Sequence, residues 1–137
     1  MISPASALRP RLLAAPRSLV VAAALLAFHA VGLSVFGLYE FTQVQPGRVM
    51  TGLVSAFLLV VWGLALGAGG WAMLGGRLWA RGPVVAVELL HLPVAWSFRG
   101  GETTWVMLVL GLTSLAVIVL VLLPASTRHL TGAETSD

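Results

Sequence analysis

Apolar residues gather in four long runs that short polar segments separate. The runs cover residues 18–38, 49–74, 83–98 and 104–123. A bilayer core about 30 Å thick is crossed by about 20 apolar residues in a helix. The pattern therefore predicts an all-α, polytopic membrane protein, with a bundle of four transmembrane helices over residues 18–123.

Two of the runs depart from the ideal length. The second run is longer than one straight crossing needs, so we expect it to tilt or to break at the Gly-rich stretch 67–70. The third run is too short unless it also uses residues 79–82. The first run has a longer apolar region than a signal peptide and no clear cleavage site, which favours a permanent helix.

The chain ends are more polar, and arginines set the orientation. We expect residues 1–17 to be a flexible cytoplasmic N-terminus and residues 124–137 a flexible cytoplasmic tail. Cytoplasmic loops of membrane proteins are enriched in basic residues. If each run crosses the membrane once, Arg48 and Arg99 lie on one side of the membrane. Six arginines lie on the other side: Arg9, Arg11, Arg17, Arg77, Arg81 and Arg128. Both termini are therefore predicted to be cytoplasmic, in a multi-pass membrane protein.

Composition narrows the function classes. Hydrophobic residues make up 58% of the 137 residues and charged residues 9%, against about 45–50% and about 25% in soluble domains. The basic residues are scattered between apolar runs, so no nucleic-acid surface is expected. The chain has no cysteine, which excludes disulfides and cysteine-ligated metals. We predict no metal site and no catalytic residue.

Polar side chains recur at one depth of the predicted bundle. The middle of each run carries one or two of them: His29, Trp62, Glu88 with His91, and Thr113 with Ser114. Because these positions share a depth, the sequence predicts one polar layer across the bundle.

Glu88 and His91 are the least expected residues of this layer. Three residues apart, they share a helical face and can touch. An ionised acid at the bilayer centre costs about 2.5–3.5 kcal/mol, so Glu88 is expected to be protonated, to pair with His91 or His29, or to meet water. Pro93 removes a backbone hydrogen bond in the same segment, which predicts a helix kink there.

A structural interpretation competes with a functional one for this layer. Buried polar groups can simply hold helices together, at about 1 kcal/mol per hydrogen bond. Burying a carboxylate costs more free energy than such a contact returns, which favours a functional role for Glu88. Gly63 and Gly67 form a GxxxG pattern, which is typical of close helix packing.

The segment "WARGPVVAVELLHLPVAWSF" at 79–98, with "LVLLPASTR" at 120–128, resembles a group of small four-helix integral membrane proteins of actinobacterial type. The resemblance covers the whole chain in topology and is specific in those two segments. It implies a four-helix membrane fold and a multi-pass location in a bacterial plasma membrane, and no catalytic role is carried over from it.

Three functions fit these observations. The first is a non-enzymatic accessory or scaffold protein that acts through helix contacts. It would lie in the lipid bilayer and bind either another membrane protein or a second copy of itself. The second is a proton or small-solute transport component that uses His29, Glu88 and His91. The third is a haem-binding bundle with His29 and His91 as axial ligands. No other cofactor is expected, and no enzyme motif is present.

Overall fold

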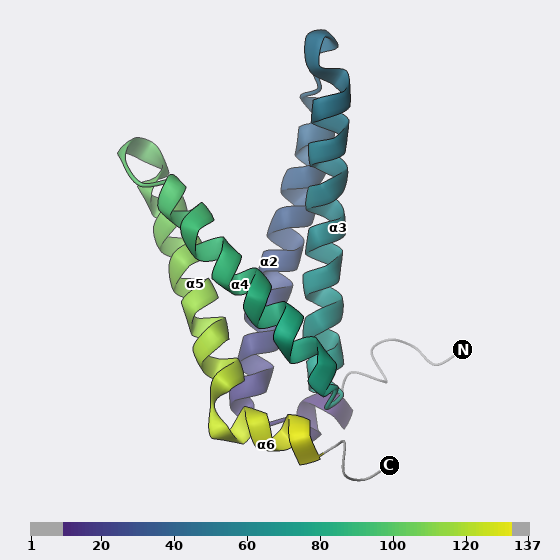
Figure 1. Cartoon of the computed structure of the whole chain (residues 1–137), viewed down its shortest axis with the longest axis vertical. Helices are drawn as coiled ribbons and strands as arrows, with labels where there is room; N and C mark the ends of the chain where they lie inside the picture. Colours follow the sequence, from purple (N-terminus) through teal and green to yellow (C-terminus); the bar gives the residue numbers. More distant parts are fainter. Residues whose placement is uncertain (1–9, 133–137) are drawn as a thin grey trace, which may run out of the picture.

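The computed structural model describes residues 10–132, and that part of the chain folds into helices without a strand (Figure 1). Four long helices form two hairpins. The first hairpin pairs α2 (Arg17–Thr42) with α3 (Val49–Leu74), and the second pairs α4 (Arg81–Ser97) with α5 (Thr104–Leu122). Short 3-10 turns precede three of these helices: η1 (Pro46–Arg48), η2 (Leu78–Ala80) and η3 (Gly101–Thr103). A helix of nine residues, α6 (Pro124–Gly132), follows α5.

All four long helices are long and apolar enough to cross a membrane. The third candidate span covers Leu78–Ser97, so η2 and α4 together give the length that the run 83–98 lacks. The first helix continues to Thr42, beyond the predicted end at residue 38. Four candidate spans are therefore confirmed, with small shifts at their ends.

The expected break in the second span is absent. Helix α3 is continuous through residues 67–70. Its glycines serve close packing instead, since a Cβ atom added at Gly69 would lie 2.7 Å from a methyl group of Val84. At Gly63 an added Cβ would lie 2.6 Å from the Ala30 carbonyl oxygen. The GxxxG face therefore packs inside the first hairpin, where it brings α3 against α2.

The two hairpins meet at one end of the molecule and diverge toward the other. In Figure 1 they form a V whose arms end at η1 and η3. The closed end holds an apolar core to which every long helix and α6 contribute, including Leu19, Leu26, Leu66, Met73, Val84, Val117, Val121 and Leu130. Along α2, buried Leu19 and Leu26 are followed by His29, so the polar layer begins where this core ends.

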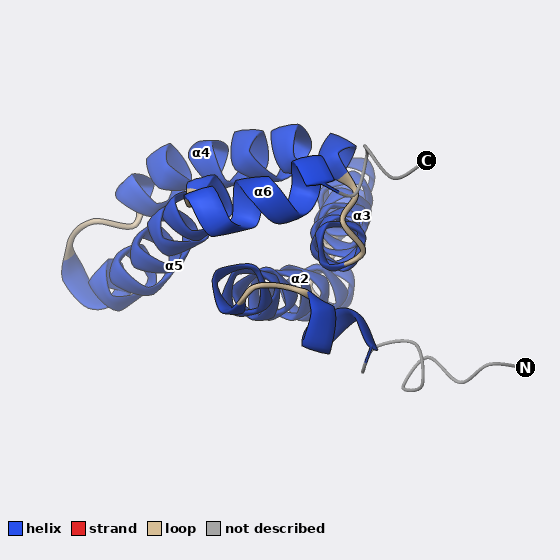
Figure 2. Ribbon diagram, turned by 90° about the horizontal axis from the view of Figure 1, so that it is seen from below, coloured by secondary structure: helices blue, strands red, loops and turns tan. Residues whose placement is uncertain are grey.

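The predicted flexible tail is wrong for residues 124–132. These residues form α6, which turns from the end of α5 across the closed end of the V (Figures 1 and 2). Leu130 is fully buried in the core. The Ser126 hydroxyl donates to the Leu120 carbonyl at 2.6 Å, and Ser18 of α2 lies 2.8 Å from the same hydroxyl. Apolar burial and these hydrogen bonds fix the segment, and residues 133–137 lie outside the described part.

The arginines separate between the two ends of the V, as the sequence predicts. Five of the six assigned to one side lie at the closed end, and Arg9 lies outside the described residues. Arg48 and Arg99 lie at the open end. Arg11 stacks on Trp71 at 4.7 Å from the ring centre, and Arg99 stacks on Trp96 at 4.8 Å. The start of α2 and the end of α6 thus lie at the same end of the molecule (Figure 1).

Candidate functional site

One stripe of α4 carries the central residues of the site. Its buried positions are Val84, Glu88, His91 and Ala95. Spacings of four, three and four residues keep these side chains on one helical face. This face is turned inward, so Glu88 is fully buried and His91 is 6% exposed.

His29 of α2 meets this stripe from the other hairpin. Its Nδ1 atom lies 3.0 Å from Oε1 of Glu88. The second carboxyl oxygen, Oε2, lies 3.3 Å from Nδ1 of His91. Glu88 therefore bridges two imidazoles, one on its own helix and one 59 positions away in the chain. This contact joins the hairpins just above the apolar core.

Thr113 of α5 extends the cluster to a third helix. Its Oγ1 atom lies 2.7 Å from Nε2 of His29 and 2.6 Å from the Val109 carbonyl oxygen. A hydroxyl has one proton to donate, and the carbonyl can only accept. Thr113 therefore donates to Val109 and accepts a hydrogen bond from Nε2–H of His29. This assigns a proton to Nε2 and leaves Nδ1 facing Glu88.

Two proton arrangements satisfy all of these contacts. In the neutral arrangement, protonated Oε1 of Glu88 donates to Nδ1 of His29, and His91 donates its Nδ1–H to Oε2. In the charged arrangement, His29 carries both ring protons and donates to the Glu88 carboxylate. The two differ in the position of one proton along the 3.0 Å contact. The cluster can therefore hold one shared proton inside the apolar part of the protein.

The predicted polar layer is assembled only in part. His29, Glu88, His91 and Thr113 are connected, and Ser114 is fully buried beside Glu88. The Ser114 hydroxyl makes no hydrogen bond among the described residues. Trp62 lies apart from the cluster, on the wall of a cavity between α3 and α4. Pro93 lies inside α4, which stays helical past it.

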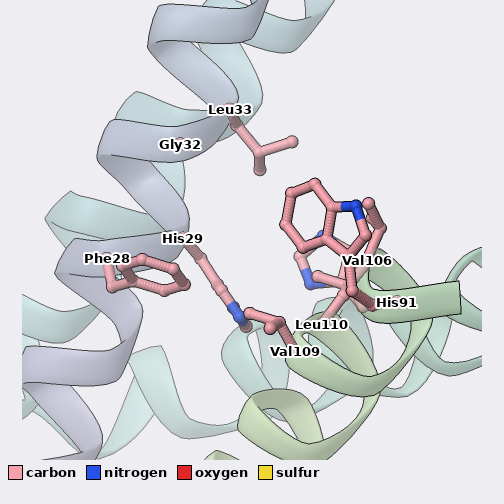
Figure 3. Close-up of a pocket in the computed structure, with 9 residues that line it drawn as sticks. Phe28, His29, Gly32, Leu33, His91, Val106, Val109 and Leu110 are labelled. Carbon is pink, nitrogen blue, oxygen red and sulfur yellow. The ribbon is translucent and has the colours of Figure 1, made fainter. Parts of the chain in front are cut away.

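Two cavities border the cluster. The smaller cavity, of about 160 Å³, lies between α2 and α5 and is lined by Phe28, His29, Gly32, Leu33, His91, Trp105, Val106, Val109 and Leu110 (Figure 3). The larger cavity, of about 650 Å³, is lined by Leu33, Ser55, Leu58, Leu59, Trp62, Leu90, His91, Pro93 and Val94. Leu33 and His91 line both. We call this space between the diverging hairpins the inter-hairpin cleft.

The cleft could not be found from the sequence. Its lining residues are ordinary apolar side chains of transmembrane helices, such as Leu33 and Val94. These residues line a cleft only because the two hairpins diverge. That divergence depends on contacts between segments that are distant in the sequence. His91 is the exception, because a polar residue in the middle of an apolar run was already a candidate site residue.

The geometry gives no support to a bis-histidine haem site. Axial ligands must point at one iron from opposite sides of the macrocycle. Here the Nδ1 atoms of His29 and His91 face the same carboxyl group, and Nε2 of His29 is bound to Thr113. The two rings also contact each other edge to face, with centres 5.3 Å apart.

Comparison of the chain with protein-family models, with curated proteins and with solved structures finds no match. The site is therefore interpreted from its own geometry.

Proposed function

We propose that the chain is a non-enzymatic accessory or scaffold protein of a bacterial plasma membrane, with both termini in the cytoplasm, that acts through helix contacts. The observation that carries this proposal is the inter-hairpin cleft. It opens at mid-depth between helices of two hairpins and is walled by apolar side chains. Such a surface matches the apolar face of another transmembrane helix.

His91 favours a protein helix over lipid as the occupant of the cleft. Its Nδ1 atom is engaged with Glu88, and its ring lines both cavities of the cleft, where a polar side chain of an occupant can reach it. A buried polar group without a partner is costly in hydrocarbon. An acyl chain offers no hydrogen bond, while a polar side chain of a partner helix can supply one.

The GxxxG face is not the contact surface in this proposal. Gly63 and Gly67 face Ala30 of the same chain, so they stabilise the hairpin. The cleft is the remaining concave surface that reaches the polar cluster, and a partner or a second copy is proposed to bind there.

Site-directed crosslinking tests the proposal, because the chain has no cysteine of its own. A single cysteine at Leu58 lines the cleft, and one at Leu112 lies on an exposed part of α5 outside it. A maleimide photo-crosslinker attached in native membranes should give a protein adduct from Leu58→Cys and none from Leu112→Cys. Mass spectrometry of the adduct distinguishes a partner from a second copy. Equal adducts from both positions, or lipid adducts alone from Leu58→Cys, would contradict the proposal.

A proton or small-solute transport component is the second candidate. It is favoured by the shared proton between His29 and Glu88, which can move without rearranging other contacts. Liposomes that contain the protein should then dissipate a pH gradient faster than empty liposomes, and Glu88→Gln should abolish the difference. If wild-type and empty liposomes behave alike, this candidate is eliminated.

A further inference from the structure

The buried cluster has the composition of a transition-metal site. It offers two imidazole nitrogens and one carboxylate oxygen, from His29, His91 and Glu88, and these donor atoms all lie within 4.8 Å of one another. Imidazole and carboxylate ligands together suit divalent zinc, iron, cobalt and nickel. All three residues are buried, so the donor atoms are held in place by the surrounding helices.

The spacing of the donors is close to what such an ion requires. Zinc binds nitrogen and oxygen ligands at about 2.0–2.2 Å in a tetrahedral arrangement, which puts neighbouring donor atoms about 3.3–3.6 Å apart. The two histidine–carboxylate separations are 3.0 and 3.3 Å. The 3.0 Å separation involves Oε1 of Glu88 and the 3.3 Å separation involves Oε2. Small side-chain movements must therefore bring one carboxyl oxygen and both imidazole nitrogens within reach of one ion.

Thr113 supplies an independent observation that points to an ion. A histidine that binds a metal through one nitrogen usually donates the other ring N–H to an oxygen nearby, which fixes its tautomer and orientation. Thr113 accepts a hydrogen bond from Nε2–H of His29 in this way, and its own hydroxyl donates to the Val109 carbonyl oxygen. The lone pair at Nδ1 of a neutral His29 is thereby directed at the cluster.

Ser114 and the smaller cavity leave room for a further ligand. The Ser114 hydroxyl is fully buried beside Glu88 and has no hydrogen-bond partner among the described residues. The cavity of about 160 Å³ borders His29 and His91 and gives space for a small ligand next to them. A divalent ion with one carboxylate carries a net charge of +1, and a hydroxide or other anion at the fourth position would neutralise it.

From these observations we infer that His29, Glu88 and His91 form a binding site for one divalent transition-metal ion between the two hairpins. The ion displaces the proton shared by His29 and Glu88 and is bound by both imidazoles and the carboxylate. This inference goes beyond the proposed accessory function, because partner binding in the cleft does not require the ion.

Cobalt binding by the full-length protein tests the inference. The protein is purified from membranes with an affinity tag that contains no histidine, treated with a chelator, and titrated with Co²⁺ in detergent. We expect one Co²⁺ per chain, visible absorption bands of a bound ion, and loss of these bands when Zn²⁺ is added. A chain that retains its helical circular dichroism but binds no Co²⁺ and no Zn²⁺ would overturn the inference.

Three variants locate the ion. The chain contains three histidines, so His129 on α6 provides a matched control, and His129→Gln should bind Co²⁺ as the wild type does. Loss of an outer contact to a ligand weakens metal affinity by about 10–100-fold, which is the range expected for Thr113→Val. The loss of a ligand in His91→Gln should weaken binding by about 100-fold or more. Unchanged binding in His91→Gln would show that the ion lies elsewhere and would overturn the proposed site.

Metal-dependent thermal stability provides a second readout. An ion that binds only the folded state raises the unfolding temperature. Zn²⁺ should therefore raise Tm for the wild type and for His129→Gln, and leave Tm of His91→Gln unchanged. An equal rise in all three proteins would contradict the proposed ligands. The crosslinking pattern from Leu58→Cys reports on the accessory function separately, so either proposal can fail alone.

Discussion

Adjacent residues of α5 have opposite roles in the polar cluster. Thr113 accepts a hydrogen bond from His29 and donates one from its own hydroxyl to the Val109 carbonyl oxygen. The Ser114 hydroxyl, one position further, lies beside the Glu88 carboxyl group and meets no hydrogen-bond geometry within residues 10–132. Burial alone therefore does not show which hydroxyl stabilises the protein. The hydrogen bonds of each hydroxyl determine its contribution to stability.

Substitution of these two residues separates the roles. Thr113→Val leaves Nε2–H of His29 without an acceptor and should lower the free energy of unfolding by about 1–2 kcal/mol. Ser114→Ala removes a buried hydroxyl that meets no hydrogen-bond geometry in the described part of the chain, so it should change stability less than Thr113→Val does. Unfolding in mixed detergent micelles measures both, with Thr113→Ser as the control that keeps the hydroxyl. If Ser114→Ala proved the more damaging change, the assigned hydrogen bonds would be wrong.

At the scale of the helices, glycine spacing controls how closely α2 and α3 approach. An added Cβ at Gly63 would lie 2.6 Å from both the Ala30 carbonyl oxygen and the Ser34 hydroxyl. At Gly67 the nearest atom, Cβ of Ala30, would be 3.5 Å away. The two glycines of one GxxxG pattern are therefore not equivalent.

This difference predicts different tolerance to alanine. Gly63→Ala forces the helices apart and should cost about 1–3 kcal/mol of stability. Gly67→Ala meets only ordinary contact and gains helix propensity, so stability should stay the same or rise by up to about 1 kcal/mol. Thermal unfolding of the two variants in the same detergent compares them directly. Equal losses at both positions would show that the α2–α3 contact differs from the one described.

Helix α6 is bound to the closed end of the V mainly through Leu130. Because this side chain is fully buried, Leu130→Ala leaves a cavity in the core and should cost about 2–5 kcal/mol. Leu122→Ala removes the same atoms from an exposed position at the end of α5 and serves as the control. Proteolysis of the tail in detergent should accelerate only for Leu130→Ala. A tail cleaved equally fast in the wild type would mean that α6 is not docked.

For the whole molecule, local signals in the sequence predict the helices, and distant contacts decide how they are arranged. The four spans follow from apolar run length, and Glu88 with His91 follow from helical spacing. The tail was misjudged because Leu130 is a single apolar residue in a polar segment, and its burial depends on a core that four other helices build. The contact between His29 and Glu88 was one of several expected possibilities, and the packing of the two hairpins decides it.

The polar cluster is central to this arrangement because it joins the two hairpins where the apolar core ends and the inter-hairpin cleft begins. Both proposals depend on it. The accessory function uses His91 at the inner end of the cleft, and the metal site uses all three ligands. Each requires His29 of the first hairpin to lie against Glu88 of the second.

The most direct test is solid-state NMR of the protein in lipid bilayers, with ¹⁵N-labelled histidine and ¹³C-labelled glutamate. A dipolar contact between a glutamate carboxyl carbon and imidazole nitrogens of two histidines is predicted, because Glu88 bridges His29 and His91 at 3.0 and 3.3 Å. Glu88→Gln should abolish this contact, and His129→Gln should preserve it. A carboxyl group in contact with one histidine only, or with none, would contradict the junction between the hairpins.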